Sequence, residues 1–386
     1  MSAEFDVVVV GGGPAGSACA ISIADRGYSV QLVEKTASRS HKLCGEFLSP
    51  DVLLNLRRLG LEQTIVSAGA QKISRLRIVD SSGVELRRNL PLSAAGISRA
   101  ELDERLLAAA SRRGVHVVRG VAAASITGDL DNGFEVACSN GAVVRTRLAI
   151  AAFGRQSSLD PRPRKAKHQQ SHNWVAFKSH FDRIDVADVI ELFLFERGYC
   201  GLSMVENGKA NVCWIMASQD LQAAGGKPLN ALKQALASNG PARDRLAPGE
   251  PVFERFLSVS GLSFSSRGCF AGAVPVCGDA AGMIAPLCGD GIAMAVESAG
   301  ILAGCAADYL DGAVDAVTFR QVYYAKWNNR FKRRLWVGRR LQSVLMNPSA
   351  AARLLTIGRA IPGLTDLVFR TTRGRLTPQT HEANDP

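Results

Sequence analysis

The sequence predicts an α/β fold with three parts: a domain built on a parallel sheet, an inserted antiparallel β-sheet domain and a C-terminal helical segment. Three observations predict this fold. A valine run at residues 7–10 leads into a glycine-rich turn and an apolar helix, short apolar strands follow one another over residues 173–217, and residues 318–345 have helical periodicity. The chain of 386 residues, 47% hydrophobic and 21% charged, is typical of a globular protein of about two domains.

The first unit of the chain reads strand, turn, helix, strand. The run at residues 7–10 is rich in β-branched residues and too short for a buried helix, which is typical of a parallel strand covered on both faces. Helical periodicity follows over residues 14–26, and a second strand covers residues 29–33. The turn has the pattern G-x-G-x-x-G, in Gly11, Gly13, Pro14, Ala15 and Gly16, and the second strand ends at Glu34 and Lys35.

Each glycine of this turn has a physical role in binding a dinucleotide. Gly11 permits the tight turn, Gly13 lets the backbone approach a pyrophosphate, and Gly16 lets the helix pack closely on the strand. The N-terminus of the helix offers N–H groups to phosphate oxygens, and Glu34 accepts hydrogen bonds from a ribose. Because strand, glycines, helix, strand and acid occur in this order, the sequence predicts a dinucleotide site here.

A second helix follows before the strand at residues 116–119, and it begins with Ser98 and Glu101 in the spacing of a capping box. Arg99 lies in its first turn, where the helix dipole repels a cation. Either a ligand phosphate or carbonyl faces this arginine, or it is a solvated surface side chain. A strand at residues 116–119 then leads to Val121, a predicted dinucleotide contact, and to an antiparallel meander over residues 121–152 that ends near Gly154.

The segment at residues 276–303 predicts a second glycine-rich helix start, far from the first in sequence. A short strand reaches Gly278 and Asp279, a turn passes Pro286, and a long apolar helix opens after a glycine pair. The predicted cofactor contacts at this helix start are Gly289, Asp290, Gly291 and Ile292. Two such helix starts fit one extended dinucleotide that lies across the fold.

On these residues the chain resembles the FAD-dependent superfamily that includes class A (p-hydroxybenzoate hydroxylase-like) flavin monooxygenases, flavin halogenases and geranylgeranyl reductases, and it looks most like the last. The resemblance covers nearly the whole chain, through "GGGPAG", the arginine of "SRAELD" and the block "GDAAG…P…GDG". It implies a glutathione-reductase-type, Rossmann-like FAD-binding domain in which Asp279 holds the ribityl chain. It also implies that the helix after Gly291 points its N-terminus at the flavin's pyrimidine end, where negative charge develops on reduction.

Two positions depart from the hydroxylases of this superfamily. Gly282 stands where they usually have histidine, as in the reductases, and Phe153-Gly154 replaces the customary Asp-Gly, a departure that bears on any NAD(P)H contact. The W-x-W-x-I-P motif of the halogenases is absent from the sequence, so halogenation is set aside.

The stretch "KLCGE" places Cys44 and Gly45 where the geranylgeranyl reductase-like proteins have a cysteine and glycine near the flavin. Reduction of an alkene needs a hydride on one carbon and a proton on the other, and a free thiol is mostly protonated at neutral pH. Two interpretations stay open: Cys44 is a proton donor, or it is a small packed residue. A nearby Glu46 would discourage a thiolate, and Lys42 would favour one.

Residues 173–217 predict an antiparallel sheet that covers the substrate. In its first strand Lys178 and His180 share one face, because side chains alternate along a strand. They either supply charge or protons to a substrate, together with Cys44 and Glu46, or form a solvent-facing edge. The apolar residues of the remaining strands suit a hydrophobic substrate.

The positive charge of the chain is concentrated near its C-terminus. The net charge is +11, and residues 318–375 contain 13 Lys and Arg against one acid, Asp366. Aromatic and apolar residues recur every four positions in this segment, at Phe319, Tyr323, Trp327, Phe331 and Leu335. This stripe either packs on the body of the protein or forms an interfacial helix on an anionic membrane. No nucleic-acid partner is predicted, because no known nucleic-acid-binding motif accompanies the arginines.

Composition and segment limits complete these expectations. Nine scattered cysteines fit neither a disulfide framework nor a zinc site, so no metal is predicted. The N-terminus lacks signal-peptide features, which favours a cytoplasmic protein, either free or peripheral at the membrane. The expected FAD-binding domain covers residues 1–70, 97–159 and 262–312; the substrate domain covers 71–96 and 160–261; a basic helical region covers 313–376; and 377–386 is a disordered tail.

The resemblance implies an FAD-dependent oxidoreductase that acts on a hydrophobic small molecule of isoprenoid, lipid-like or polyketide character. The expected reaction is hydride transfer to or from a carbon–carbon bond, with NAD(P)H or another electron donor. One alternative is a class A-type monooxygenase that hydroxylates an aromatic or polyketide substrate through a flavin hydroperoxide. The alternative of another class is a non-enzymatic flavin-binding protein associated with membranes.

Overall fold

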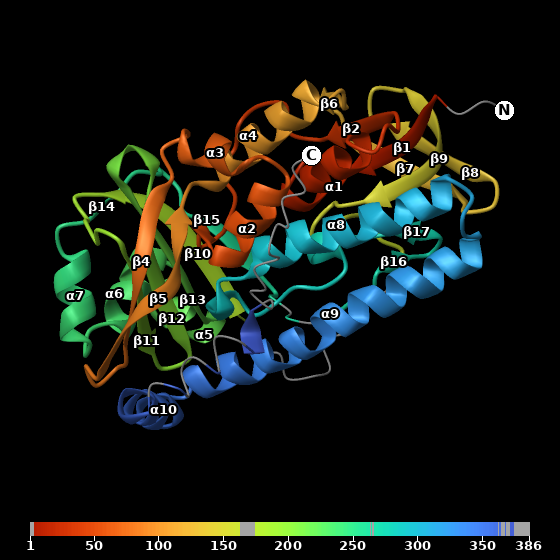
Figure 1. Cartoon of the computed structure of the whole chain (residues 1–386). Helices are drawn as coiled ribbons and strands as arrows, with labels where there is room; N and C mark the ends of the chain where they lie inside the picture. The colour runs from red at the N-terminus through yellow and green to blue at the C-terminus, as the bar shows by residue number, and fades with distance from the viewer. Residues whose placement is uncertain are drawn as a thin grey trace, which may run out of the picture.

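The computed structural model describes residues 4–162, 174–262, 264, 266–361, 363, 367 and 371–373. Two large sheets organise these residues, one of six strands and one of nine (Figure 1). The predicted tail at 377–386 and the last part of the basic helical region lie outside the described residues. The α/β fold class predicted from the sequence is confirmed.

The six-stranded sheet has the order β6-β2-β1-β9-β8-β7. Its first four strands are parallel, and the last two add an antiparallel meander. The strands are β1 (Phe5–Val10), β2 (Val30–Glu34), β6 (His116–Arg119), β7 (Ala123–Asp129), β8 (Gly133–Cys138) and β9 (Val143–Ala151). The predicted strand, turn, helix, strand order is present. The valine run lies in the centre of the sheet because its side chains are buried on both faces.

Two helices pack on this sheet, α1 (Pro14–Ala24) and α4 (Arg99–Arg112), and a third, α8 (Gly291–Leu310), packs on α1. All residues of α1 from Pro14 to Ile23 are buried, since the helix lies between the sheet and α8. Ser98 caps α4 as predicted, because its hydroxyl accepts a hydrogen bond from the N–H of Glu101 at 3.1 Å. Two short helices, α2 (Pro50–Arg58) and α3 (Glu62–Val66), connect this layer to the second sheet.

The nine-stranded sheet takes strands from two distant parts of the chain and has the order β14-β10-β13-β12-β11-β4-β5-β3, with β15 paired to β10. The strands are β3 (Phe47–Leu48), β4 (Gln71–Val79), β5 (Glu85–Gly96), β10 (Trp174–Asp182), β11 (Val189–Phe195), β12 (Gly198–Val205), β13 (Lys209–Ala217), β14 (Glu250–Pro251) and β15 (Leu257–Ser260). It is antiparallel except where β11 pairs with β4. The helices α5 (Ser218–Ala223), α6 (Pro228–Ala235) and α7 (Gly240–Leu246) follow β13.

The chain returns from the second sheet to the first through a few short elements. These are β16 (Phe270–Ala271), β17 (Val274–Pro275), and the single turns Gly278–Ala280 and Pro286–Cys288; a further turn, Glu206–Gly208, joins β12 to β13. Val276 forms a parallel bridge with Ala151, so the segment that carries Asp279 runs beside the end of β9. The predicted strand into Gly278 is therefore shorter than expected, and it is partly replaced by a helical turn.

The helix α9 (Ala316–Leu345) runs alongside α8, and α10 (Pro348–Ala360) lies at the end of α9 next to the nine-stranded sheet (Figure 1). The side chains of the aromatic stripe of α9 are at most 2% exposed, and the hydroxyl of Tyr323 donates to the carbonyl of Val276 at 2.8 Å. The interfacial interpretation of this stripe is therefore wrong: these five side chains are the means by which α9 packs on the body.

Among the described residues, α8 is the one helix that is long and apolar enough to cross a membrane. Its most apolar window is 61% buried inside the protein, where α8 packs against α1 and α9. Packing of this kind is typical of a core helix.

Candidate active site

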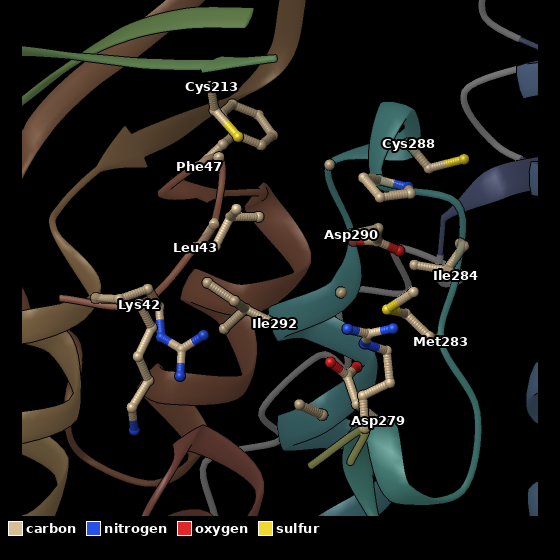
Figure 2. Close-up of a pocket in the computed structure, with 18 of the residues that line it drawn as sticks. Lys42, Leu43, Phe47, Cys213, Asp279, Met283, Ile284, Cys288, Asp290 and Ile292 are labelled. Atoms are coloured by element: carbon tan, nitrogen blue, oxygen red, sulfur yellow. The ribbon is translucent and has the colours of Figure 1, made fainter. Parts of the chain in front are cut away.

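One cavity of about 790 Å³ runs along the junction of the two sheets. The glycine turn after β1 forms one end, the start of α8 and the loop before it form one wall, and the loop at residues 42–47 forms the facing wall. Figure 2 shows the two walls, with Lys42, Leu43 and Phe47 opposite Asp279, Met283 and Cys288. The cavity then continues along apolar side chains of the nine-stranded sheet.

The glycine turn is shaped by close backbone approach. Gly11 has φ of 110°, a conformation that favours glycine, and a Cβ at Gly16 would lie 1.8 Å from the carbonyl oxygen of Gly11. Gly13 differs, since the nearest atom to its Cβ position is a guanidinium nitrogen of Arg99 at 3.8 Å. Gly11 and Gly16 therefore build the turn, whereas Gly13 leaves space on the cavity side, where Pro14 and Ala15 also line the wall.

The first turn of α1 offers its N–H groups to the cavity. Gly13 is the N-cap residue and supplies no side-chain hydrogen bond, whereas Ser98, Asp315 and Asn347 cap α4, α9 and α10 with their side chains. Uncapped N–H groups at a helix N-terminus attract phosphate oxygens. This arrangement fits the predicted pyrophosphate site.

Glu34 at the end of β2 lines the cavity beside Lys35. One of its carboxylate oxygens accepts a hydrogen bond from the N–H of Gly12 at 2.6 Å, and the other accepts from the N–H of Thr36 at 3.0 Å. Burial alone would raise the pKa of this carboxyl, but these hydrogen bonds outweigh it and lower the pKa. Val121 is not on the cavity wall; its N–H donates to the carbonyl of Glu34 at 3.2 Å and so supports the strand end.

Arg99 lines the cavity with a guanidinium that is largely buried, so the alternative of a solvated surface arginine is wrong. It forms two hydrogen bonds with Asp103, at 2.9 and 3.0 Å, and Lys42 pairs with the same carboxylate at 2.8 Å. Burial opposes the charge on Arg99, but Asp103 outweighs it and raises the pKa of the guanidinium. The sequence analysis missed Asp103, although its spacing four residues after Arg99 on a helix is a recognisable ion-pair signal.

The start of α8 forms the other end of the polar region. Asp279, Pro286 and Gly291 line the cavity together with Gly289 and Ile292, and Cys277 and Cys288 also reach the wall. The carboxylate of Asp279 has no hydrogen bond or ion pair among the described residues, and burial raises its pKa. Such a carboxylate is a ready acceptor for hydroxyl groups of a ligand. Gly278 lies off the wall, where it packs against Ala15 and joins the two glycine segments.

Asp290, the N-cap residue of α8, is fully buried but does not cap its own helix. Its carboxylate accepts a hydrogen bond from the hydroxyl of Ser49 at 2.8 Å and pairs with Arg334 of α9. The first N–H groups of α8 are therefore not taken by this side chain, and they face the cavity end at Gly291 and Ile292. Asp290 itself lines the cavity, as predicted (Figure 2), and its ion pair with Arg334 of α9 was not predicted from the sequence.

Cys44 lies on the wall between the polar and the apolar parts of the cavity, and its thiol is half-buried. Its sulfur accepts a hydrogen bond from the N–H of Glu46 at 3.4 Å, and its carbonyl accepts from the side chain of Asn211 at 3.3 Å. The charged group of Lys42 is paired with Asp103, and that of Glu46 is paired with Lys178. A second thiol, that of Cys213 on β13, lines the same cavity (Figure 2).

Glu46, Lys178 and His180 form a buried cluster directly behind Cys44. Glu46 and Lys178 are fully buried and His180 is 5% exposed, so the solvent-facing edge expected for β10 is wrong. Glu46 pairs with Lys178 through one carboxylate oxygen, and the other lies 2.6 Å from Nε2 of His180. Burial opposes the charge on Glu46, but His180 and Lys178 outweigh it and lower the pKa. Lys178 and His180 do not reach the cavity wall.

His41 adds a partly exposed ring to this cluster, 5.0 Å from the ring of His180. Burial and the nearby His180 and Lys178 lower the pKa of His41. The ligand atoms of His41, Glu46 and His180 lie within 4.8 Å of one another, a spacing that a metal ion needs. A metal ion on Glu46 would also meet the buried ammonium of Lys178, so the charges favour a hydrogen-bonded cluster over a metal centre.

The rest of the cavity is apolar. Side chains from β4, β5, β11 and β13 line it, and α9 and α10 close its far end. The lining residues of this part include Leu76, Ile78, Leu86, Leu90, Ile190, Leu192, Ile215, Leu341, Leu345, Leu354 and Leu355. The sequence analysis predicted an apolar wall from the sheet but not the contribution of α10.

The residues present fit an FAD molecule. The cavity wall at Gly13 and Gly291 leaves room for a ligand. A Cβ at Gly13 would have its nearest neighbour, a nitrogen of Arg99, at 3.8 Å, and a Cβ at Gly291 would meet nothing within 4 Å. The cavity offers each group that an extended dinucleotide needs. Glu34 can bind a ribose, the uncapped N-termini of α1 and α8 can bind the phosphates and the flavin, and Asp279 adds a carboxylate between them. Phe153 and Gly154 also line the cavity, as does Gly45, where a Cβ would meet nothing within 4 Å.

Comparison with known proteins agrees with this site. Menaquinone reductases are similar in sequence: that of Mycolicibacterium smegmatis is 28% identical over 47% of this chain and 45% of its own, and that of Mycobacterium tuberculosis is 26% identical over 95% of this chain and 88% of its own. Digeranylgeranylglycerophospholipid reductase 2 of Methanopyrus kandleri is 25% identical over 85% of this chain and 83% of its own.

Among solved structures, the flavin-dependent brominase Bmp2 matches with a TM-score of 0.81 at 18% identity, over 95% of this chain and 93% of its own, which shows a shared fold. The model of the FAD binding domain family matches residues 4–317. The match spans both sheets, both glycine turns and all of α8. The chain therefore belongs to the FAD binding domain family and is an FAD-dependent oxidoreductase.

Proposed function

We propose that this FAD-dependent oxidoreductase transfers a hydride to or from a carbon–carbon bond of a hydrophobic small molecule, of isoprenoid, lipid-like or polyketide character. One observation carries the proposal: a single cavity joins the two glycine turns to an apolar wall, and Cys44 lies where the two parts meet. Bound FAD supplies the hydride in the direction of reduction and accepts it in the direction of desaturation.

In this proposal the polar half of the cavity holds the cofactor. The first N–H groups of α1 bind the pyrophosphate beside Gly13, and the carboxylate of Asp279 accepts hydrogen bonds from the ribityl hydroxyls. The first N–H groups of α8 face the flavin ring, where they stabilise negative charge. Arg99 adds a fixed positive charge next to Gly13, held in place by Asp103.

Cys44 provides the proton in the direction of reduction. One carbon of the double bond receives the hydride, and the other receives the proton from the thiol of Cys44, which water then reprotonates. NAD(P)H or another donor supplies the two electrons for the next cycle. The hydrogen bond from the N–H of Glu46 keeps the sulfur at the cavity wall, and the ion pair with Lys178 keeps Glu46 in place.

The names of the relatives support reduction over hydroxylation. Two relatives that match 95% and 85% of the chain are named menaquinone reductase and digeranylgeranylglycerophospholipid reductase 2, and the second name specifies a phospholipid with geranylgeranyl chains. A long apolar chain would fit the wall formed by β4, β5, β11, β13 and α10. The cytoplasmic location stays a prediction.

The proposal is tested by reducing the purified holoprotein under anaerobic conditions and adding candidate isoprenoid quinones or lipids. We expect the flavin absorbance to return without oxygen, together with a product that has gained one hydride and one proton by mass spectrometry. A product that forms only when air is admitted, and that carries one added oxygen atom, would instead establish the monooxygenase alternative.

A further inference from the structure

Exposed apolar side chains gather on the last two helices. In the described residues, most of the large apolar side chains that are exposed lie from residue 317 onward. Trp336 is 54% exposed, and Val344 lies two turns later on the same face of α9. On α10, Ile357 is 45% exposed, and Ile361 just after the helix is 56% exposed. Clustered exposed apolar side chains mark interaction surfaces.

The charged side chains on these two helices are all positive. Arg333, Arg340, Arg353 and Arg359 are exposed on the same two helices, and residues 316–361 contain no Asp or Glu. The guanidinium of Arg340 lies over the ring of Trp336, 5.5 Å from its centre. The two helices thus combine apolar anchors with cations and carry no acid of their own.

The helix α10 also closes the apolar end of the cavity. Leu354, Leu355 and Gly358 face inward and line the cavity, whereas Arg353 and Ile357 face outward. The backbone of α10 is held to the sheet by Arg88, which donates to the carbonyl of Gly358. A single layer of helix therefore separates the apolar cavity from the basic, apolar surface.

We propose that α10 and the last three turns of α9 form a docking surface for an anionic lipid bilayer. Tryptophan and arginine side chains are favourable at the level of the lipid headgroups. Ile357 and Ile361 would insert at the boundary between headgroups and acyl chains. Charge and composition favour lipid over nucleic acid, because exposed aliphatic side chains add nothing to phosphate contacts. Docking places α10 between the bilayer and the cavity, so that an apolar substrate reaches the site without crossing water; this last step rests on the proposed function.

The docking is measured by flotation of the holoprotein with vesicles of neutral phosphatidylcholine, or of phosphatidylcholine mixed with anionic phosphatidylglycerol. We expect binding to the anionic vesicles that falls with added salt, since exposed charges are screened. Removing two cations, in Arg340→Ser/Arg353→Ser, is expected to weaken binding about fivefold for each cation. The matched control Arg145→Ser/Arg183→Ser removes two exposed arginines elsewhere and is expected to bind as wild type.

The apolar anchors are tested in the same way. Trp336→Ser/Ile357→Ser/Ile361→Ser is expected to lose most of its vesicle binding, whereas Val66→Ser/Leu92→Ser/Val143→Ser, which removes exposed apolar side chains elsewhere, is expected to retain it. Flavin absorbance of each variant shows that it is folded.

Equal binding of wild type and both C-terminal variants, or stronger binding to duplex DNA than to anionic vesicles at the same salt, would overturn the proposal. Flotation measures membrane binding without any substrate. The proposed reaction is measured separately, with substrate dissolved in detergent, so the failure of one proposal can be distinguished from the failure of the other.

Discussion

The carboxylate of Glu46 lies 2.6 Å from Nε2 of His180, although the two residues are 134 positions apart. Lys178 pairs with the other oxygen of the same carboxylate, two residues before His180 on β10. Glu46 itself has φ of 53°, an unusual value for a residue other than glycine, and it turns the chain directly after Cys44. The buried cluster therefore holds the loop of Cys44 against the nine-stranded sheet.

Glu46→Gln is expected to destabilise the protein by about 3–5 kcal/mol, because Lys178 would be left as a buried charge without its partner. Denaturant unfolding of the holoprotein measures the change. The double variant Glu46→Gln/Lys178→Met is expected to recover part of the loss, since it removes the unpaired charge. Unfolding of Glu46→Gln at the wild-type midpoint would contradict this account.

The same ion pair predicts a pH dependence in acid. The folded state lowers the pKa of Glu46 below its ordinary value of 4.5, so its contribution to stability is present above that value and is lost as the pH falls through the lower pKa of the folded state. Thermal unfolding as a function of pH is expected to show a weaker acid limb for Glu46→Gln than for wild type. Parallel curves would mean that other groups carry the acid sensitivity.

Asp51 predicts a change in the opposite direction. Burial and the nearby charge of Asp290 raise its pKa from 3.8 to about 6, so this carboxyl favours the folded state while protonated and destabilises it as the pH rises toward 6. Asp51→Asn is expected to gain stability relative to wild type over this range and to keep the gain at neutral pH. The melting temperatures of the variant and of wild type at successive pH values check this prediction. If the difference between the two proteins is the same below pH 4 as above pH 6, the prediction is wrong.

Cys44→Ser is expected to lower kcat by about 100-fold or more, because a hydroxyl is a much weaker acid than a thiol at neutral pH. Flavin content is expected to stay at the wild-type level. Cys213→Ser is the matched control, since its sulfur lines the same cavity and burial raises its pKa to about 12. If Cys213→Ser loses activity and Cys44→Ser does not, the proton donor has been assigned to the wrong thiol.

The two glycines of the first turn are expected to respond differently to alanine. Gly16→Ala places a methyl group 1.8 Å from a backbone oxygen and is expected to impair folding, whereas Gly13→Ala fits the protein and is expected to reduce FAD affinity alone. Fluorescence titration of the apoprotein with FAD, together with its melting temperature, separates these effects. Gly300→Ala, in open space on α8, serves as the neutral control.

Asp279→Ala is expected to weaken FAD binding by about 10- to 100-fold, the value of a hydrogen bond to a charged group. Asp279→Asn keeps one acceptor oxygen and is expected to lie between alanine and wild type. Equal dissociation constants for the three proteins would show that Asp279 does not contact the cofactor.

The sequence by itself determined the local units of this protein. The valine run, the glycine spacing and the capping serine dictate β1, α1 and α4 through contacts between residues near one another in the chain, and these elements form as predicted. The helix start at Gly291 and the apolar strands at residues 174–217 were predictable for the same reason.

Only the tertiary structure decided which side chains meet. The alternation of β10 correctly put Lys178 and His180 on one face, yet it gave no means to know that Glu46 would cover that face and bury both. In the same way, the periodicity of α9 located the aromatic stripe but not the body that buries it. Likewise, α10 closes a cavity whose sheet wall, from β4, β5, β11 and β13, lies more than a hundred residues away in the chain. Burial and ion pairing depend on surfaces supplied by distant segments, and a local pattern carries no information about them.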